Sequence, residues 1–307
     1  MIPHKRVIRV INTFLFSDIF FVYLVLSGFC IQQTRLAGKN VFPARGFAKV
    51  LTEEEASDRL QKYRSFVARD LNTTSFHAAY AFRFRMRHMP RRGNEFSRTG
   101  TVYGPSLGHG LSRIDLDSTD AQTKIQKFLL HNGAKPSAWL LSSSMENSRE
   151  VGSYELFQPM FDGMNQSPFD FLMPFVFWDA NYIKSGRVAG RPSHIYSFLP
   201  PPWVKEIRSD MTEIIMALDN SYEAPLRIET FSKSNVPTQT FILNSMKKIS
   251  DHWIVKSLDC KNRKDRSNTR FEVISAALNL DLDLSLFSPG GLLRIPVIPP
   301  EAFISLE

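Results

Sequence analysis

The sequence is poor in cysteine and in long hydrophobic runs. Its 307 residues include 2 cysteines, Cys30 and Cys260, which can form neither a disulfide framework nor, by themselves, a zinc site. A single stretch near the N-terminus approaches the length needed to cross a bilayer, which excludes a polytopic membrane protein. With 43% apolar and 22% charged residues, the composition also excludes a disordered chain.

Several motifs of catalysis and cofactor binding are also missing. The sequence has no GxxxxGK[ST] phosphate loop, no HExxH and no CxxC. The glycines of Gly104–Gly110 lie between predicted strands rather than before a helix, and they do not match a dinucleotide fingerprint. The seven histidines show no metal-ligand spacing, and Asp281 and Asp283 are better explained as a solvated strand edge. We therefore predict no catalytic residues, no metal site and no cofactor.

Residues 1–37 read as an export signal or an N-terminal anchor. A basic head precedes the apolar run Ile19–Ile31, which is typical of a secretory signal. Asp18 argues against a spanning helix, because a carboxylate near its centre costs about 2.5–3.5 kcal/mol. Acylation at Cys30 is a third possibility. The sequence thus predicts a protein of the periplasm or cell envelope, with residues 38–50 as a linker.

A helix is predicted from Leu51 to about Asp70. Thr52 and Glu55 have the spacing of a capping box, and apolar residues recur at helical intervals after them. From Ser75 the period changes to two. One face of the strand that follows is apolar and carries Phe76, Ala78, Tyr80, Phe82, Phe84 and Met86. The other face is increasingly basic, with arginines at 83, 85 and 87.

About ten further strands follow at intervals of roughly 10–15 residues, separated by turn residues. They are predicted at 95–103, 111–116, 125–130, 138–143, 194–199, 211–218, 226–231, 240–249, 252–259 and 270–276. About eleven antiparallel strands indicate a mainly β (α+β) protein with one large, strongly curved sheet or barrel. The predicted domain spans residues 51–287.

Two segments differ from these strands. Residues 154–183 are dense in phenylalanine and are broken by Pro159, Pro168 and Pro174, so we predict short helical turns packed against the mouth of the sheet. Residues 288–307 are rich in proline and are predicted to be an extended tail. A curved sheet that is too wide to be filled by its own side chains encloses a cavity. A cavity lined by aromatic residues would favour acyl chains. For any single aromatic residue, ordinary core packing is the simpler role.

Segments spread over roughly residues 55–280 resemble a known family. They are Leu111–Ile114, Phe169–Trp178 with Tyr182, Gly186–Pro192, Asp219 with Pro225–Arg227, Lys247–Ile254 and Thr269–Arg270. In this order and spacing they resemble the bacterial outer-membrane lipoprotein-sorting, LolA-like superfamily, and in particular its larger, less characterised branch. The resemblance implies an unclosed β-barrel with a helical lid that binds lipoprotein acyl chains or other lipids. On that basis the expected ligand-binding residues are Tyr80, Phe82, Phe84, Phe171, Phe175 and Trp178.

The leading hypothesis is therefore an exported, non-enzymatic carrier or sensor of acylated ligands that acts in lipoprotein sorting. Its expected partners are lipoprotein acyl chains or lipid, an anionic membrane surface and an envelope transport protein. One alternative is an envelope hydrolase with a dispersed His/Asp/Ser site. Another is a basic module that binds membrane surfaces. No nucleic acid is expected, because the aromatics of residues 76–86 lie on the face opposite the arginines.

Overall fold

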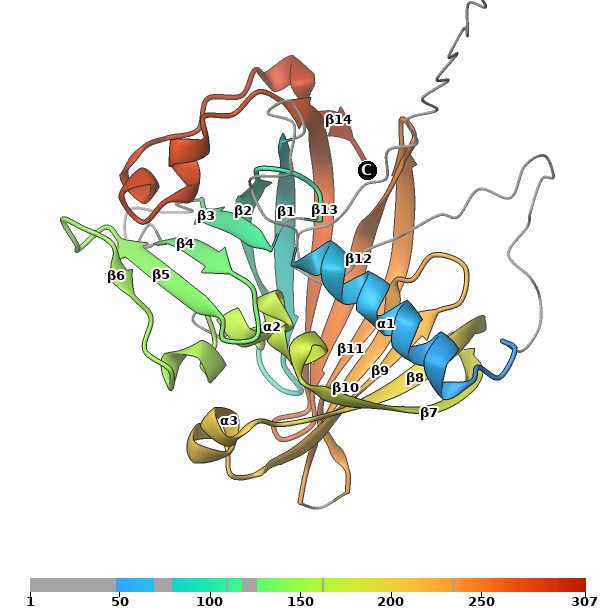
Figure 1. Cartoon of the computed structure of the whole chain (residues 1–307). Coiled ribbons are helices and arrows are strands. Elements are labelled where there is room, and N and C mark those ends of the chain that lie inside the picture. Colours follow the sequence, from blue (N-terminus) through green and yellow to red (C-terminus); the bar gives the residue numbers. More distant parts are fainter. Residues whose placement is uncertain (1–47, 69–78, 109, 118–125, 162, 234) are drawn as a thin grey trace, which may run out of the picture.

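The computed structural model describes residues 48–68, 79–108, 110–117, 126–161, 163–233 and 235–307. The predicted signal or anchor at 1–37, the linker up to residue 47 and the start of the first predicted strand lie outside the described residues. One antiparallel sheet of 14 strands dominates the structure and curls around the helices without closing (Figure 1). This confirms the predicted mainly β fold with an unclosed, curved sheet.

The sheet consists of two arms that meet at its centre. The first arm contains β1 (Ala79–Met89), β2 (Phe96–Gly104), β3 (Leu111–Leu116), β4 (Gln126–His131), β5 (Ser137–Ser142) and β6 (Arg149–Glu150). The second contains β7 (Asp179–Val188), β8 (Arg191–Leu199), β9 (Met211–Asp219), β10 (Pro225–Ser232), β11 (Pro237–Ile249), β12 (His252–Asn262) and β13 (Ser267–Leu280). Within each arm, strands adjacent in the sequence pair with each other, and β1 pairs with β13 to join the arms. The outermost strands are β6 and β7.

Three α-helices and several 3-10 turns accompany the sheet. The helices are α1 (Glu53–Val67), α2 (Pro168–Leu172) and α3 (Pro202–Ile207). The 3-10 turns are η2 (Glu155–Phe157), η3 (Pro174–Phe177), η4 (Leu284–Phe287), η5 (Gly290–Leu293) and η6 (Pro300–Ala302). Within the part of the chain that the structure describes, no helix combines the length and apolar character needed to span a bilayer.

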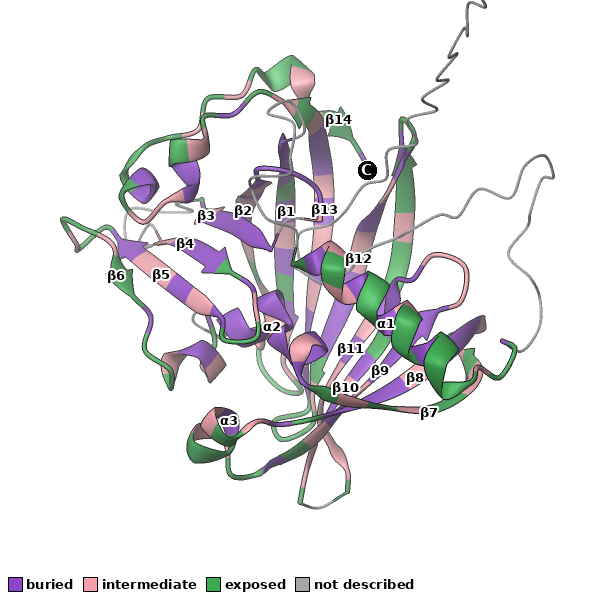
Figure 2. Cartoon of the chain, in the orientation of Figure 1, coloured by how far each residue is buried: buried purple, intermediate pink, exposed green. Residues whose placement is uncertain are grey.

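Helix α1 forms as its sequence predicts. Thr52 and Glu55 make a reciprocal capping box, which satisfies backbone N–H groups at the start of the helix. Its buried residues are Ala56, Leu60, Tyr63 and Val67, and the opposite face is exposed (Figure 2). Arg64 donates to the carbonyl oxygens of Val176 at 2.6 Å and Trp178 at 2.5 Å. The helix is thereby fixed to the segment that precedes β7.

Strand β1 shows the predicted alternation. Tyr80, Phe82, Phe84 and Met86 are at most 3% exposed and lie in the main hydrophobic cluster, and Arg83 and Arg87 are exposed on the other face. Each buried aromatic removes a large apolar surface from water. The strand therefore contributes an apolar wall to the enclosed face of the sheet and a charged surface to its outer face.

The segment between β6 and β7 covers the enclosed face, and we call residues 154–178 the inner cover. Because β6 and β7 are the two ends of the sheet, the connection between them must cross the opening. Helix α2 begins with a capping box made by Ser167 and Asp170. It ends at Met173, whose φ of 46° lies in the left-handed region, and η3 then starts at Pro174. The predicted short helical turns are confirmed.

The C-terminal segment covers the opposite face of β3–β5, and we call residues 282–306 the outer cover. Successive residues of β4 face different clusters: Phe128 and Leu130 belong to the main one, whereas Leu129 belongs to a second. Outer-cover members of the second cluster are Leu282, Leu286, Phe287 and Leu292. The chain ends with β14 (Ile304–Ser305), which pairs with β13.

The buried Arg113 of β3 holds the outer cover in place. Its guanidinium is 0% exposed and donates to the carbonyl oxygens of Gly291 at 2.9 Å and Arg294 at 2.6 Å. It also binds both carboxylate oxygens of Asp115 at 2.7 Å, and Lys127 donates to the Leu292 carbonyl at 3.0 Å. Charge-assisted hydrogen bonds of this kind are stronger than neutral ones.

Three details of the sequence prediction change. The sheet has 14 strands rather than about 11, because β6 and β14 are two residues long and β7 has no regular apolar alternation. The predicted cover 154–183 ends earlier, since β7 begins at Asp179. Residues 288–307 were expected to be extended. The structure has two 3-10 turns there, η5 and η6, whereas residues 295–299 have no regular secondary structure and β14 is extended.

Candidate functional site: the apolar interior and its cover

The six predicted ligand-binding residues all face the enclosed side of the sheet. Tyr80, Phe82 and Phe84 come from β1, Phe171 from α2, Phe175 from η3 and Trp178 from the residue before β7. All six belong to the main hydrophobic cluster and are between 0% and 4% exposed. Burial raises the pKa of Tyr80 to about 12, so its phenol stays neutral across the physiological range.

The ring contacts divide these residues into a wall group and a cover group. Phe84 of the wall stacks on Phe271 of β13, with 5.0 Å between ring centroids. Phe171 of the inner cover meets the same Phe271 edge-on at 6.3 Å. Phe271 therefore connects the wall to the cover, and its place in the predicted strand 270–276 was the signal that could have identified it.

The remaining cover residues lie further along the sheet. Phe175 contacts Phe198 of β8 at 5.3 Å between centroids and Trp178 at 6.4 Å. Trp178 also lies 5.7 Å from Phe169. The site residues thus form two neighbouring groups under one cover, one beside β1 and β13 and the other beside β8.

Two polar groups of the inner cover are buried without a partner. The Nε1 of Trp178 and the Oε1 of Gln166 make no hydrogen bond with any described residue. A buried, unsatisfied donor or acceptor costs about 1–3 kcal/mol. The closed arrangement of the cover is therefore less stable than its apolar packing alone would make it.

A polar cavity of about 310 Å³ lies at one end of the inner cover. Asp170 of α2 contributes a carboxylate, Lys264 of the turn between β12 and β13 contributes an ammonium group, and Phe169 and Met211 are also in the lining. Gln239 of β11 donates to Asp170 Oδ2 at 3.2 Å. The sequence analysis did not single out this cavity, because its residues come from separate strand ends and turns.

A second polar cluster anchors the start of α1. Ser185 Oγ donates to the Lys49 carbonyl at 2.6 Å and lies 2.8 Å from His194 Nδ1. His194 Nε2 lies 2.8 Å from Asn220 Oδ1. The single hydroxyl hydrogen of Ser185 is directed at the Lys49 carbonyl, so it is not available to His194 as a proton to abstract. The cluster lacks the arrangement of an activated nucleophile.

The turn after β2 contains a further serine that the sequence analysis does not single out. Gly104–Gly108 reads Gly-Pro-Ser-Leu-Gly, which fits the spacing of a hydrolase nucleophile elbow. That motif requires a strand, a sharp turn and then a helix, whereas this turn connects β2 to β3. Ser106 is 4% exposed, and its Oγ has no hydrogen-bond partner among the described residues. No described base therefore lies within hydrogen-bond reach of Ser106.

Two other histidines were candidates for a polar site. His252 is buried at the start of β12, and His109 lies outside the described residues. No group of three or more His, Cys, Asp or Glu side chains suited to a metal ion occurs in the described ranges. Cys260 is buried, and burial raises the pKa of its thiol well above its usual value. It lies in the main hydrophobic cluster, where it packs as a small buried hydrophobe.

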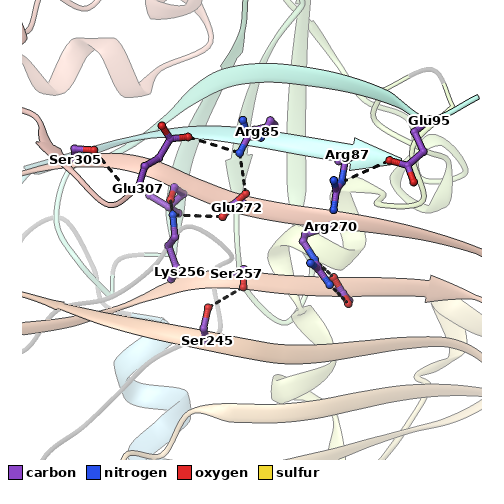
Figure 3. Close-up of polar contacts among 12 residues, drawn as sticks. Arg85, Arg87, Glu95, Ser245, Lys256, Ser257, Arg270, Glu272, Ser305 and Glu307 are labelled. Carbon is purple, nitrogen blue, oxygen red and sulfur yellow. Dashed lines mark hydrogen bonds and ion pairs between the residues drawn. The ribbon is translucent and has the colours of Figure 1, made fainter. Parts of the chain in front are cut away.

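The outer face of β1, β12 and β13 carries paired charges (Figure 3). Arg85 lies 3.1 Å from Glu272 and 3.6 Å from Glu307. Arg270 binds both carboxylate oxygens of Asp259, at 2.7 and 3.0 Å. The arginines that made this strand look basic are therefore largely balanced by carboxylates, which weakens the attraction of this face for an anionic surface.

Solved structures with a similar fold provide the comparison. A DUF1329 family protein from Desulfovibrio piger gives a TM-score of 0.63 at 16% identity, over 78% of this chain and 98% of that one. A domain named for outer-membrane lipoprotein sorting, from Vibrio parahaemolyticus, gives 0.62 at 16% identity, over 78% and 100%. A LolA superfamily protein from Nitrosomonas europaea gives 0.54 at 12% identity, over 76% and 97%.

This chain has the LolA-superfamily fold. Comparison with protein-family models and with curated proteins gives no match to the sequence. The LolA-type architecture covers most of the chain and nearly all of each similar structure.

Proposed function

We propose that this chain is an exported, non-enzymatic carrier or sensor that binds the acyl chains of lipoproteins or other lipids in its apolar interior. The observation that carries the proposal is the pairing of an aromatic wall with an aromatic cover. Phe84 and Phe171 come from segments far apart in the sequence and both contact Phe271. The cover crosses the opening of the sheet, so its movement would expose one continuous apolar surface.

In this proposal Tyr80, Phe82 and Phe84 form the fixed wall, and Phe171, Phe175 and Trp178 move with the inner cover. The wall residues belong to β1, which is paired on both sides. An acyl chain entering between wall and cover recovers about 0.8 kcal/mol for each methylene that it buries. The unpartnered Trp178 Nε1 and Gln166 Oε1 lower the cost of opening, because both can reach water when the cover lifts.

Export to the periplasm or cell envelope, with cleavage or retention of residues 1–37, completes the proposal. Its support is the basic, then apolar N-terminal sequence and the LolA-type fold. A carrier of this kind needs an envelope partner to deliver or accept its ligand. The exposed turn residues Arg91, Arg92, Arg263 and Arg266 are the part of the described surface that would meet anionic headgroups.

The test uses the full chain and a fluorescent long-chain fatty acid as the probe. The purified protein is first extracted and its lipids are identified by mass spectrometry, and probe binding is then titrated by fluorescence. We expect co-purified acylated lipid and saturable, competable probe binding. Absence of both lipid and probe binding would overturn the proposal.

A matched pair of variants assigns the binding to the inner cover. Phe171→Ala removes packing that holds the inner cover closed, so we expect it to increase probe affinity at least fivefold. Phe287→Ala removes the same ring from a buried position in the outer cover, and we expect unchanged affinity. Equal effects of the two substitutions would show that the probe does not enter beneath the inner cover.

A further inference from the structure

The polar cavity beside the inner cover is lined by two opposite charges that form no ion pair with any described residue. It occupies about 310 Å³ where α2, the chain before β9 and the ends of β10–β12 meet. We propose that it binds a small zwitterionic group, an ammonium joined to a phosphate or carboxylate. Asp170 receives the ammonium and Lys264 receives the anion.

The carboxylate of Asp170 has a free side. Its Oδ2 accepts hydrogen bonds from Ser167 N at 2.8 Å, Ser167 Oγ at 2.7 Å and Gln239 Nε2 at 3.2 Å. Its Oδ1 has no partner among the described residues, and no described Lys or Arg lies within ion-pair distance. Burial raises the pKa of Asp170, and the positive charge of Arg208, which is paired with Asp210, opposes this only in part. A bound ammonium would supply further positive charge.

Lys264 provides the opposite charge. It is exposed in the turn between β12 and β13, where its backbone N–H donates to Asn262 Oδ1 at 2.9 Å. Its ammonium group forms no ion pair with any described carboxylate. A side chain that lines the cavity and carries an unbalanced positive charge is available to a phosphate or carboxylate of the ligand.

The second cation of the cavity is already balanced. Arg208 donates to both carboxylate oxygens of Asp210, each at 2.9 Å. Because Arg208 and Asp210 pair with each other, the charges left for a ligand are the Asp170 carboxylate and the Lys264 ammonium group. A simple anion or a simple cation would pair with one of them, whereas a zwitterion would pair with both.

The rest of the lining suits a headgroup at the edge of an apolar interior. Thr230, Thr238 and Asn262 offer hydroxyl and amide groups, and Phe169 and Met211 also belong to the main hydrophobic cluster. The zwitterion can be the phosphoethanolamine headgroup of a lipid or a free amino acid, which share the chemistry. The inference does not depend on acyl-chain binding, because it can be tested with a soluble headgroup that carries no acyl chain.

The experiment is calorimetric titration of the full chain with soluble probes. These are phosphoethanolamine, glycerophosphoethanolamine and serine, together with inorganic phosphate and ethanolamine as the two halves. We expect at least one zwitterion to bind tenfold more tightly than either half. Preference for glycerophosphoethanolamine indicates a lipid headgroup, whereas preference for serine indicates an amino acid.

Variants locate the binding. Lys264→Ala lies in an exposed turn and is expected to weaken zwitterion binding about tenfold. Lys261→Ala is its control, since Lys261 is exposed nearby but does not line the cavity. Asp170→Asn keeps the shape of the side chain and removes the charge, with the same expected loss.

Binding of no zwitterion, equal binding of the halves, or equal effects at 264 and 261 would overturn the inference. The fatty-acid titration reads out the proposed function separately. Either idea can therefore fail without the other.

Discussion

The two covers of the sheet are held in different ways. The outer cover is held through its backbone, because Arg113 and Lys127 of the sheet bind its carbonyl oxygens. The inner cover is tied at Asn165, whose Nδ2 donates to the Cys260 carbonyl at 3.2 Å, at Asp170, which accepts from Gln239 Nε2 at 3.2 Å, and near its end by Arg64. Between these ties it meets the sheet mainly through aromatic rings.

The two kinds of contact differ in the free energy needed to break them. Charge-assisted bonds from a fully buried guanidinium are costly to break, because the charge and the carbonyls would be left unsatisfied. Apolar packing can be exchanged for another apolar partner at little net cost, and an acyl chain is such a partner. On the proposed function, the inner cover is therefore the one that we expect to open.

Removing the buried cation should produce the largest effect. Arg113→Ala leaves Asp115 and three carbonyl groups of the outer cover without their donor. We expect a loss of about 3–5 kcal/mol in the free energy of unfolding, measured by urea denaturation. The control is Arg294→Ala, which breaks an exposed ion pair with Asp283 and should cost less than about 1 kcal/mol. Equal losses would contradict this account of the outer cover.

The tight turn of the outer cover can be tested with adjacent glycines. A Cβ at Gly291 would overlap the Ser285 carbonyl oxygen, whereas one at Gly290 meets nothing within 4 Å. Gly291→Ala should therefore lower the free energy of unfolding by about 1–3 kcal/mol, and Gly290→Ala should leave it nearly unchanged. Thermal and urea unfolding of both variants provide the measurement, and probe affinity should be unchanged in each.

A smaller change should strengthen the inner cover. Gln166→Met replaces a buried amide, whose Oε1 has no partner in the described structure and whose Nε2 reaches the Thr269 carbonyl at only 3.4 Å. We expect a gain of about 1 kcal/mol in stability together with slower uptake of the fatty-acid probe in stopped-flow fluorescence. Stabilisation with unchanged uptake would show that the cover does not gate the interior.

Acidification should destabilise the polar cluster of Ser185, His194 and Asn220, which anchors the start of α1. Burial lowers the pKa of His194 below its ordinary 6.5, so the unfolded chain binds a proton more readily than the folded one. The free energy of unfolding should therefore fall as the pH decreases below about 6.5. His88 acts in the same direction, because burial lowers its pKa too. His194→Asn should flatten the pH dependence, measured by unfolding at a series of pH values, and an unchanged slope would exclude this contribution.

The sequence was most informative where one regular pattern determined the structure. The alternation over 80–86 predicted the buried wall, and the Thr52 and Glu55 capping box predicted the start of α1. The prolines at 168 and 174 predicted a broken cover, since each stands at the start of a short helical turn. In each case a local rule is sufficient, because the relevant contacts are close in the chain.

The remaining features depend on contacts between distant segments. The hydrogen bond from Arg113 to the Gly291 carbonyl joins residues 178 positions apart, and no spacing rule predicts it. The cavity brings Asp170, Gln239 and Lys264 into one lining in the same way. Strand β7 lacked a pattern because it is an edge strand whose residues are all exposed or half-buried.

The pairing of β1 with β13 also constrains when the protein can fold. Ala81 lies opposite Ala277, so the central seam of the sheet joins the beginning of the domain to its end. Each arm can form from neighbouring hairpins, but the seam must wait until β13 has been synthesised. Until then β1 and β12 have unpaired edges that attract other strands. If the chain crosses a membrane unfolded, this late pairing of β1 with β13 would keep it from folding before transit. Chaperones would then be needed most during transit.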